Sequence, residues 1–400
     1  MASNRPLTVV APTPFFTEGG CSYRVLGETR AFARAGVPVR VLTYPSGRDL
    51  PGIQIIRPRT TSRKMGIGLN PIRPLYDLEL LRVLLRYGRD KGTLHVHLHE
   101  GGLLGIVEKS LRMRPFVLDL EGSLIEEASR TYPAINRGIL GSLGRRLEAF
   151  IETSAAQVVV SSSGLFEALS RSGHISKERL NLVPDGVDIN DFVPKQAVPA
   201  KDILRWREAH GLAMDDILAV YVGGISPQQG IDDLLDRAPS MLAQAPKLRF
   251  IVFGVASQLN SLQSYVSKAK SMGLEKRVLF PGPLPFEQVP IALASSDIGL
   301  TWKYSLLEGS GKIPLYMAAG LPTVALNTPA HIHYLGADGS RGGIISADKD
   351  DAAKAVVTLA LDEGRRDALG RRAREVAESE LSWSVMAEKL LQIHDALAQY

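Results

Sequence analysis

Residues 7–43 read LTVVAPTPFFTEGGCSYRVLGETRAFARAGVPVRVLT. The stretch begins with an apolar, β-branched run at 7–11 and continues through a loop with paired glycines. A helix-like segment at 24–35 follows, and a second apolar run occupies 39–43. The order of strand, loop, helix and strand is typical of a parallel sheet whose strands are joined by crossover helices.

The same alternation continues along the chain, with a break at 191–200 that predicts a linker. The further predicted strands are 93–98, 116–120, 157–161, 180–183, 217–223, 248–254, 278–281, 298–302 and 323–326. The predicted helices of the second half are 231–243, 259–272, 312–319, 350–361 and 384–399. We therefore expect an α/β protein with two Rossmann-like, doubly wound parallel-sheet domains facing a cleft.

Composition narrows the class of protein. With 400 residues, 45% of them hydrophobic and 22% charged, the chain has the composition of a globular protein of two or three domains. The single cysteine, Cys21, excludes an intramolecular disulfide and a cysteine-rich zinc site. No apolar run approaches the roughly 18 residues of a bilayer span, so we expect a cytoplasmic protein. A net charge of +5 does not indicate a nucleic-acid partner.

Ligands of doubly wound sheets bind at the carboxyl ends of the strands, so the loops there are candidate sites. Gly19 and Gly20 follow the first strand; paired glycines before a helix let the backbone approach an anionic ligand, or simply form a turn. Farther along, the stretch Glu308-Gly309-Ser310-Gly311-Lys312 opens a predicted helix. Its lysine and backbone N–H groups could hold a phosphate and Glu308 a ribose diol, or Lys312 could be solvated.

Three histidines alternate in the stretch His95-Val96-His97-Leu98-His99-Glu100, and alternation on a strand places them on one face. A row of imidazoles could bind a metal, as in a metal-dependent hydrolase. The alternative is that the histidines line a cleft and bind substrate, and on balance we expect no metal.

The stretch Asp119-Leu120-Glu121-Gly122-Ser123 follows another predicted strand. A carboxylate at a strand tip suits sugar hydroxyls or proton transfer, which makes Glu121 a candidate site residue. Ser123 could also cap the next helix, with Glu126 completing a capping box.

Taken together, these stretches resemble the glycosyltransferases of the GT-B fold, in the retaining family 4. The resemblance covers nearly the whole chain. The matching stretches are PTPFFTEGG, AGVPVRVLT, HVHLHEG, DLEGSL, SSSGLFEAL, LVPDGVDINDF, VYVGGISPQQGIDDLL, RVLFPGPLPFEQVP, EGSGKIPLYMAAGLPTVA and LSW.

The resemblance implies a retaining, metal-independent sugar transfer from a nucleotide-diphosphate sugar, UDP- or GDP-linked, to an unidentified acceptor hydroxyl. The nucleotide sugar is a substrate, and no cofactor is expected. Residues 1–195 would form the acceptor-side domain, residues 196–383 the donor-binding domain, and a C-terminal helix at 384–400 would pack back on the first domain.

The resemblance also assigns roles to donor-side residues. Gly19 and Gly20 match the glycine loop that approaches the donor diphosphate, and Glu308 matches the first glutamate of the family's two-glutamate motif. The second glutamate position falls at Leu315 or Tyr316, neither of which can replace a carboxylate. The nucleotide base is expected around 283–285, which includes Pro283 and Leu284.

Two basic residues that bind the diphosphate in the family are replaced here by Gly224 and Gln229. We expect the cationic side chains of Lys312 and Lys303, with N–H groups of Ser310 and Gly311, to compensate. Glu121, where many members have a histidine, would orient the sugar or the acceptor. His99 and Glu100 are acceptor-side candidates by topology. These losses leave a non-catalytic, glycan- or nucleotide-binding relative as a further alternative.

Residues 57–91 contain nine basic and three acidic residues, a local excess larger than that of the whole chain. This basic segment could contact anionic lipid as a peripheral membrane surface, bind an anionic acceptor, or be a solvated face. The leucines at 80, 81, 84 and 85 form a stripe that more often belongs to a core.

Overall fold

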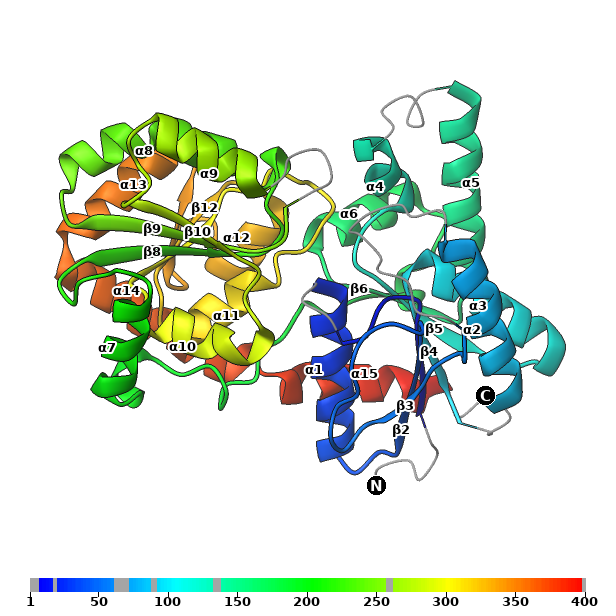
Figure 1. Cartoon of the computed structure of the whole chain (residues 1–400). Helices are drawn as coiled ribbons and strands as arrows, with labels where there is room; N and C mark the ends of the chain where they lie inside the picture. The colour runs from blue at the N-terminus through cyan, green and yellow to red at the C-terminus, as the bar shows by residue number, and fades with distance from the viewer. Residues whose placement is uncertain are drawn as a thin grey trace. The chain divides into compact units, whose positions relative to one another are not determined.

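The computed structural model describes residues 7–16, 20–60, 72–87, 92–131, 138–256 and 262–397. The chain divides into two compact units. Unit 1 comprises Met1–Asp185, Leu307–Gly309 and Trp383–Tyr400, and unit 2 comprises Gly186–Leu306 and Ser310–Ser382. Each unit is a parallel sheet covered by helices (Figure 1).

Unit 1 contains a sheet in the order β3-β2-β1-β4-β5-β6-β7, in which every pairing is parallel. Its strands are β1 (Leu7–Ala11), β2 (Val39–Thr43), β3 (Gln54–Ile56), β4 (Leu94–His97), β5 (Phe116–Leu120), β6 (Gln157–Val160) and β7 (Leu180–Leu182). Its helices are α1 (Gly20–Arg34), α2 (Arg73–Tyr87), α3 (Leu98–Arg112), α4 (Leu124–Thr131), α5 (Gly138–Ser154), α6 (Ser163–Ser172) and α15 (Trp383–Leu397). All residues of β1 and β5 are buried, as expected for strands covered on both faces.

Unit 2 contains a second parallel sheet, in the order β10-β9-β8-β11-β12-β13. Its strands are β8 (Ile217–Val222), β9 (Leu248–Phe253), β10 (Val278–Gly282), β11 (Ile298–Thr301), β12 (Thr323–Leu326) and β13 (Gly343–Ser346). Its helices are α7 (Ala200–Ala209), α8 (Ile231–Gln244), α9 (Leu262–Ser271), α10 (Val289–Ala294), α11 (Lys312–Ala318), α12 (Pro329–Leu335), α13 (Lys349–Leu361) and α14 (Glu363–Glu380). The prediction of two doubly wound parallel-sheet domains is confirmed.

The passage from unit 1 to unit 2 lies at Asp185/Gly186, earlier than the expected boundary at 195. The segment between these positions is bound within unit 2. Arg374 of α14 donates from Nη1 to the Phe192 carbonyl at 2.6 Å and from Nη2 to the Ile189 carbonyl at 3.1 Å. Hydrogen bonds from a buried or half-buried guanidinium to several carbonyls fix a chain segment that has no regular structure.

Each sheet has one point at which the strand order reverses direction, between β1 and β4 in unit 1 and between β8 and β11 in unit 2. Ligands of doubly wound folds bind outside the carboxyl ends of the strands at such points. The predicted donor residue Gly224 lies in the loop after β8, and Lys312 begins α11 directly after the loop that follows β11. The ends of β1 and β4 lead to Gly20 and His99. The fold therefore places residues from several predicted stretches at the two positions where this architecture binds ligands.

Candidate active site

Close backbone packing shapes the loop after β8. Gly223 and Gly254 have φ angles of 147° and 154°, which side-chain-bearing residues rarely adopt. A Cβ on Gly254 would lie 1.6 Å from the Gly223 carbonyl oxygen, so a side chain at Gly254 would displace the loop. Gly224 is different, because a Cβ there meets no described atom within 4 Å. The space beside the Gly224 Cα is therefore not filled by any described residue.

Lys312 is the first residue of α11 and its side chain reaches the loop after β8. Its Nζ donates a hydrogen bond to Gln229 Oε1 at 3.3 Å and lies 4.9 Å from the centre of the Tyr221 ring. Among the described residues, no carboxylate forms an ion pair with Lys312. Burial lowers the pKa of Lys312 to about 8, so at neutral pH the site holds a largely charged ammonium without a compensating anion.

Ser310 is positioned by a chain of polar groups that leads into the core of unit 2. Its Oγ lies 3.4 Å from Thr301 Oγ1, which lies 3.3 Å from His331 Nε2. His331 Nδ1 is 2.7 Å from the Leu326 carbonyl and therefore carries the proton, which leaves Nε2 as an acceptor. Burial lowers the pKa of His331 to about 3, so this imidazole is neutral.

Leu315 and Tyr316, the two candidates for the position of the second glutamate, have structural roles. The Tyr316 hydroxyl accepts a hydrogen bond from the Val222 amide at 3.0 Å and donates to the Leu300 carbonyl at 3.3 Å, which ties β8 to β11. A Cβ on Gly299 would lie 2.6 Å from the Tyr316 ring, so the ring packs directly on β11. Leu315 is buried as well. Neither residue replaces the missing carboxylate.

Other predicted donor residues lie on loops after strands of unit 2. Lys303 follows β11 and is buried, and Pro283 and Leu284 follow β10 with exposed and half-buried side chains respectively. Glu308 lies in the short stretch Leu307–Gly309, which belongs to unit 1, whereas Ser310, Gly311 and Lys312 belong to unit 2. The EGSGK stretch is thus divided between the units.

In unit 1, the end of β5 is dominated by a buried charge cluster made of Arg24, Glu28, His95, His97, Asp119 and Asp185. Arg24 donates to both oxygens of Asp119, from Nε at 2.9 Å and from Nη2 at 2.7 Å. The same guanidinium reaches Asp185 Oδ1 at 3.1 Å and Glu28 Oε1 at 3.1 Å. Arg24 overcomes the effect of burial and holds the pKa of the Asp119 carboxyl below its usual range.

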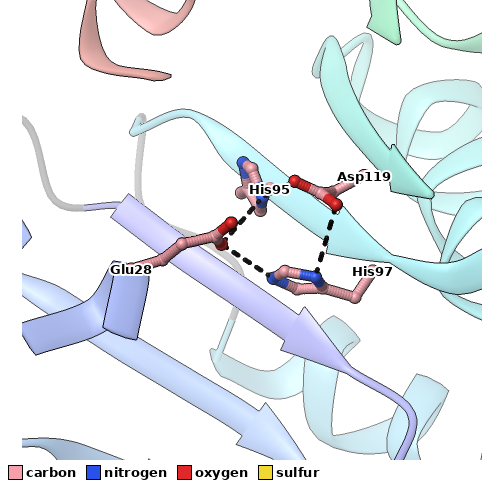
Figure 2. Close-up of side chains that lie close together, drawn as sticks. All are labelled: Glu28, His95, His97 and Asp119. Carbon is pink, nitrogen blue, oxygen red and sulfur yellow. Dashed lines mark ion pairs between the residues drawn. The ribbon is translucent and has the colours of Figure 1, made fainter. Parts of the chain in front are cut away.

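Two histidines complete the cluster, and Figure 2 shows their side chains converging with those of Glu28 and Asp119. Glu28 Oε2 lies 3.3 Å from His97 Nε2 and 3.5 Å from His95 Nε2. Burial disfavours the charged imidazole, but Glu28 and Asp119 outweigh it and raise the pKa of His97. His95 Nδ1 lies 3.0 Å from Nε2 of His394, on α15. The cluster therefore joins α1, β4, β5 and the C-terminal helix.

Four of these residues could each offer one ligand atom to a metal, since such atoms of Glu28, His95, His97 and Asp119 all lie within 4.8 Å of one another. The arrangement fits a guanidinium better than a metal ion, because Arg24 already donates to both Asp119 oxygens and contacts Glu28. A divalent ion bound to these carboxylates would lie next to that fixed positive charge. The metal-dependent hydrolase is therefore not favoured.

The expected row of three histidines is interrupted after its second member. β4 ends at His97, and Leu98 has a φ of 63°, so the chain turns into α3 and His99 lies on the helix. His99 Nε2 lies 3.4 Å from Glu152 Oε1 of α5. Glu100 accepts a hydrogen bond from Arg73 Nη1 at 2.9 Å. The prediction that all three histidines share one strand face is wrong, because it assumed that the strand continued past His97.

Glu121 follows β5 and is half-buried beside the charge cluster. Burial and the charge of Asp185 raise the pKa of Glu121 to about 7, against the opposing effects of Cys21 and Arg24. The carboxyl group is therefore present in both protonation states near neutral pH, and it can donate or accept a hydrogen bond. One of its oxygens, Oε1, is buried and has no hydrogen-bond partner among the described residues.

The helix after Glu121 is capped from two directions. Ser123 Oγ accepts from the Glu126 amide at 3.2 Å, which is one of the two hydrogen bonds of the predicted capping box. Glu148 of α5 accepts from Ser123 Oγ at 2.8 Å and from the Ile125 amide at 3.1 Å. The capping contribution of Glu148 was not predicted from the sequence, because Glu148 lies on a helix farther along the chain.

The remaining predicted residues are placed only in part. Gly19 lies outside the described residues, and Gly20 is the first residue of α1. The basic segment 57–91 is described at 57–60 and 72–87. There Arg57 pairs with Asp49, Arg73 with Glu100, and Arg82 with Glu79. Leu80 and Leu84 are fully buried, so the leucine stripe of α2 belongs to the core.

The structure adds residues that sequence reasoning missed. Tyr221 and Thr301 contact the predicted site residues Lys312 and Ser310, and the charge of Arg24 acts to lower the pKa of Glu121, yet nothing in their local sequence marks these three residues. His331, which forms a short pair with His333 in the sequence, supports Ser310 through Thr301. Within the described residues, none of the helices is both long enough and apolar enough to cross a membrane.

Two protein-family models match the chain. The model described as "Glycosyl transferase 4-like domain" matches residues 19–186, and the model described as "Glycosyl transferases group 1" matches residues 202–376.

Full-length relatives carry consistent names. The chain is 24% identical to a D-inositol 3-phosphate glycosyltransferase of Kribbella flavida, over 98% of this chain and 96% of the relative. It is 26% identical to an enzyme of the same name from Acidothermus cellulolyticus, over 95% of this chain and 86% of the relative.

Solved structures agree on the fold. Sucrose-phosphate synthase from Thermosynechococcus elongatus superposes with a TM-score of 0.79 at 18% identity, covering 99% of this chain and all of that one. The Anabaena protein HepE, in complex with UDP and glucose, superposes with a TM-score of 0.75 at 16% identity and covers the same shares.

Proposed function

Because the chain belongs to the GT-B glycosyltransferases, with a family-4-like first half and a group 1 second half, we propose that it transfers a sugar from a nucleoside-diphosphate sugar to an acceptor hydroxyl with retention at the anomeric carbon. Most of the proposed donor-binding residues belong to unit 2, whereas Gly19, Gly20, Glu308 and the acceptor-side residues belong to unit 1. We propose UDP as the nucleotide, with GDP as the second candidate, since HepE was crystallised with UDP and with UDP-glucose.

The observation that carries the proposal is the ammonium group of Lys312. It lies beside the glycine loop after β8, at the point where the unit 2 sheet reverses its strand order, and no described carboxylate pairs with it. Lys312 is partly buried, and a charge withdrawn from water without a counter-charge is costly unless a ligand of opposite charge completes it. A diphosphate is such a ligand, and the open position at Gly224 leaves it room.

In the proposed reaction, the bond between the sugar and the diphosphate breaks and negative charge grows on the leaving diphosphate. Lys312 stabilises that charge, with Lys303, Ser310 and Gly311 beside it, which makes a metal ion unnecessary. Stabilising charge that develops in the transition state is usually the largest catalytic contribution. Glu308 would hold hydroxyl groups of the ribose or of the sugar.

Glu121 would orient the transferred sugar or the acceptor, because its pKa of about 7 allows it to donate or accept a hydrogen bond with a hydroxyl group. We do not assign it as a nucleophile. Glu100 and His99 would support the acceptor side, His99 through its contact with Glu152. An anionic acceptor would suit the basic segment 57–91, as in relatives named for D-inositol 3-phosphate.

A panel of nucleotides and nucleotide sugars tests donor binding by thermal unfolding. UDP and its sugar conjugates should stabilise the protein more than the ADP, TDP and CDP compounds. A ligand at about 100 times its dissociation constant adds about 2.7 kcal/mol to the free energy of unfolding. If no nucleotide shifts the transition, the proposal fails. The anomeric configuration of the product, read by NMR, tests retention separately.

A further inference from the structure

Gln229 ends the short 3₁₀ helix Pro227–Gln229 that follows β8, and its side chain meets the ammonium group of Lys312. Lys312 Nζ donates to Gln229 Oε1 at 3.3 Å, and no other acceptor of Lys312 occurs among the described residues. An ammonium group can only donate, so this contact requires the oxygen end of the carboxamide, and not its NH₂ end, to face Lys312. Gln229 therefore supplies the hydrogen bond that locates the ammonium.

Tyr221, on β8, holds both partners of this contact. Its hydroxyl donates to the Gly224 carbonyl at 2.7 Å and lies 3.0 Å from Gln229 Oε1. The centre of its ring lies 4.9 Å from Lys312 Nζ, which is within the range of a cation–π interaction. The Tyr221 side chain is fully buried on a central strand. The ammonium thus lies between an amide oxygen and an aromatic ring, both of which are fixed by the fold.

Gly223 lets the Lys312 side chain lie directly against the loop after β8. A Cβ on Gly223 would lie 3.1 Å from Lys312 Cε and 3.1 Å from the Tyr221 hydroxyl oxygen, which is closer than a Cβ ordinarily packs. The lysine stem therefore has little freedom to leave the position that Gln229 gives its ammonium.

Both groups that hold the ammonium are uncharged. Burial alone lowers the pKa of Lys312, and no charge within the described part of unit 2 opposes this effect. The other ionisable groups in this region are Lys303, after β11, and His331, on α12, whose imidazole is neutral because burial and the two lysine charges lower its pKa to about 3. A glutamate at position 229 would have the length of glutamine but would neutralise Lys312.

We infer that Gln229 is a positioning residue for the donor site, which holds the Lys312 ammonium in one place with a neutral acceptor and so leaves its charge for the diphosphate. The identity of the anion rests on the proposed function. The positioning of Lys312 by Gln229 and Tyr221 depends only on contacts within unit 2.

Gln229→Glu tests the inference, with Gln228→Glu as the matched control, because Gln228 is the neighbouring residue and its side chain is exposed. In Gln229→Glu the new carboxylate pairs with Lys312 and repels the diphosphate. The dissociation constant of UDP, measured by calorimetry, should therefore rise at least about 100-fold. Gln228→Glu should change it by at most about threefold at physiological salt. Gln229→Met, which removes the acceptor without adding charge, should weaken binding about tenfold.

A second measurement needs no nucleotide and reads the charge of Lys312 directly. Because the pKa of Lys312 is lowered to about 8 in the folded chain, its contribution to the free energy of unfolding rises from about pH 8 to about pH 10.4. The carboxylate of Gln229→Glu should raise the pKa of Lys312, so this rise should disappear in urea titrations over that range. Gln228→Glu should keep it, and a merely structural role of Gln229 would not alter it.

The inference is overturned if Gln229→Glu binds UDP as tightly as Gln228→Glu does, or if the rise in stability with pH persists in Gln229→Glu. If the wild-type protein binds no nucleotide, the proposed function fails and the diphosphate with it. In that case, loss of the rise in Gln229→Glu would still support the positioning of Lys312 by Gln229, and its persistence would overturn it.

Discussion

The two sheets reverse their strand order in the same way, but the charges at the two reversal points are arranged in opposite ways. In unit 1 the guanidinium of Arg24 is shared among Asp119, Glu28 and Asp185, and little of it is left for a ligand. In unit 2 the ammonium of Lys312 has an amide oxygen and an aromatic ring as neighbours and no described carboxylate.

This difference separates two uses of buried charge. A paired cluster holds elements together, and breaking it is costly because the partners remain buried without compensation. An unpaired charge weakens the fold slightly and is kept where a ligand supplies the opposite charge. The comparison therefore predicts that Arg24 matters to stability and Lys312 to activity.

The largest effect is expected for Arg24→Met, which leaves Asp119 and Glu28 buried without their cation. The free energy of unfolding should fall by about 3–5 kcal/mol, measured by urea titration. The control is Arg82→Met on α2, an exposed arginine paired with Glu79, for which a loss of at most about 1 kcal/mol is expected. Equal losses in the two variants would contradict the distinction.

For Lys312→Met we expect the reverse pattern. Turnover should fall by about 10- to 1000-fold, because the charge on the leaving diphosphate loses its cation. The unfolding temperature without ligand should stay the same or rise, since an uncompensated, partly buried charge has been removed. Lys354→Met, which removes an exposed lysine paired with Asp351, controls for the loss of one charge. Near-normal turnover would remove Lys312 from the mechanism.

The pKa of Lys312, lowered to about 8, predicts a pH dependence of diphosphate binding. Above pH 8 the ammonium loses its proton, so the dissociation constant of UDP should rise by up to about tenfold per pH unit. Calorimetry from pH 7 to pH 9.5 measures this, and the Lys312→Arg variant should give a flat profile because arginine stays charged.

Deprotonation of Lys312 at high pH should weaken the binding of UDP but raise the free energy of unfolding. The pKa of Lys312 is lower in the folded chain than the value of about 10.4 expected when unfolded, so the unfolded chain binds more protons between these values. The contribution of Lys312 to the free energy of unfolding therefore rises as the pH increases from about 8 to about 10.4. In Lys312→Met this contribution should be absent.

The smallest effect is expected for chelation. Because the guanidinium of Arg24 already pairs with the carboxylates of Asp119 and Glu28, EDTA should leave turnover and unfolding temperature unchanged, and elemental analysis should find no stoichiometric transition metal. A metal that is lost in Glu28→Gln, together with stability, would show that the buried charge cluster is a metal site.

The fold was predictable from sequence because its strands are short, continuously apolar and bounded by glycine or proline. Four expected strands, 7–11, 39–43, 116–120 and 323–326, match β1, β2, β5 and β12. The missed strands β3 and β13 lie at sheet edges, where burial is incomplete and the apolar signal weakens.

The site was predictable only where the residues are local. The stretch from Glu308 to Lys312 could be found because its chemistry is contiguous in sequence. Tyr221, Thr301 and His331 could not be connected with it, since they lie on β8, β11 and α12 and come near Ser310 or Lys312 only in the folded unit. The turn at Leu98 could not be predicted either, because nothing in the sequence marks a leucine that adopts a positive φ.

The helix α15 packs on unit 1 but is synthesised after unit 2. The indole of Trp383 occupies the place where a side chain on Gly27 of α1 would be, and His394 contacts His95 in the core. Unit 1 is therefore begun before unit 2 is synthesised and completed only after it, when α15 is made. Until α15 emerges, the face of α1 that receives it lacks this cover, and a chain ended at Ser382 should bind hydrophobic dyes and chaperones far more than the chain that contains α15.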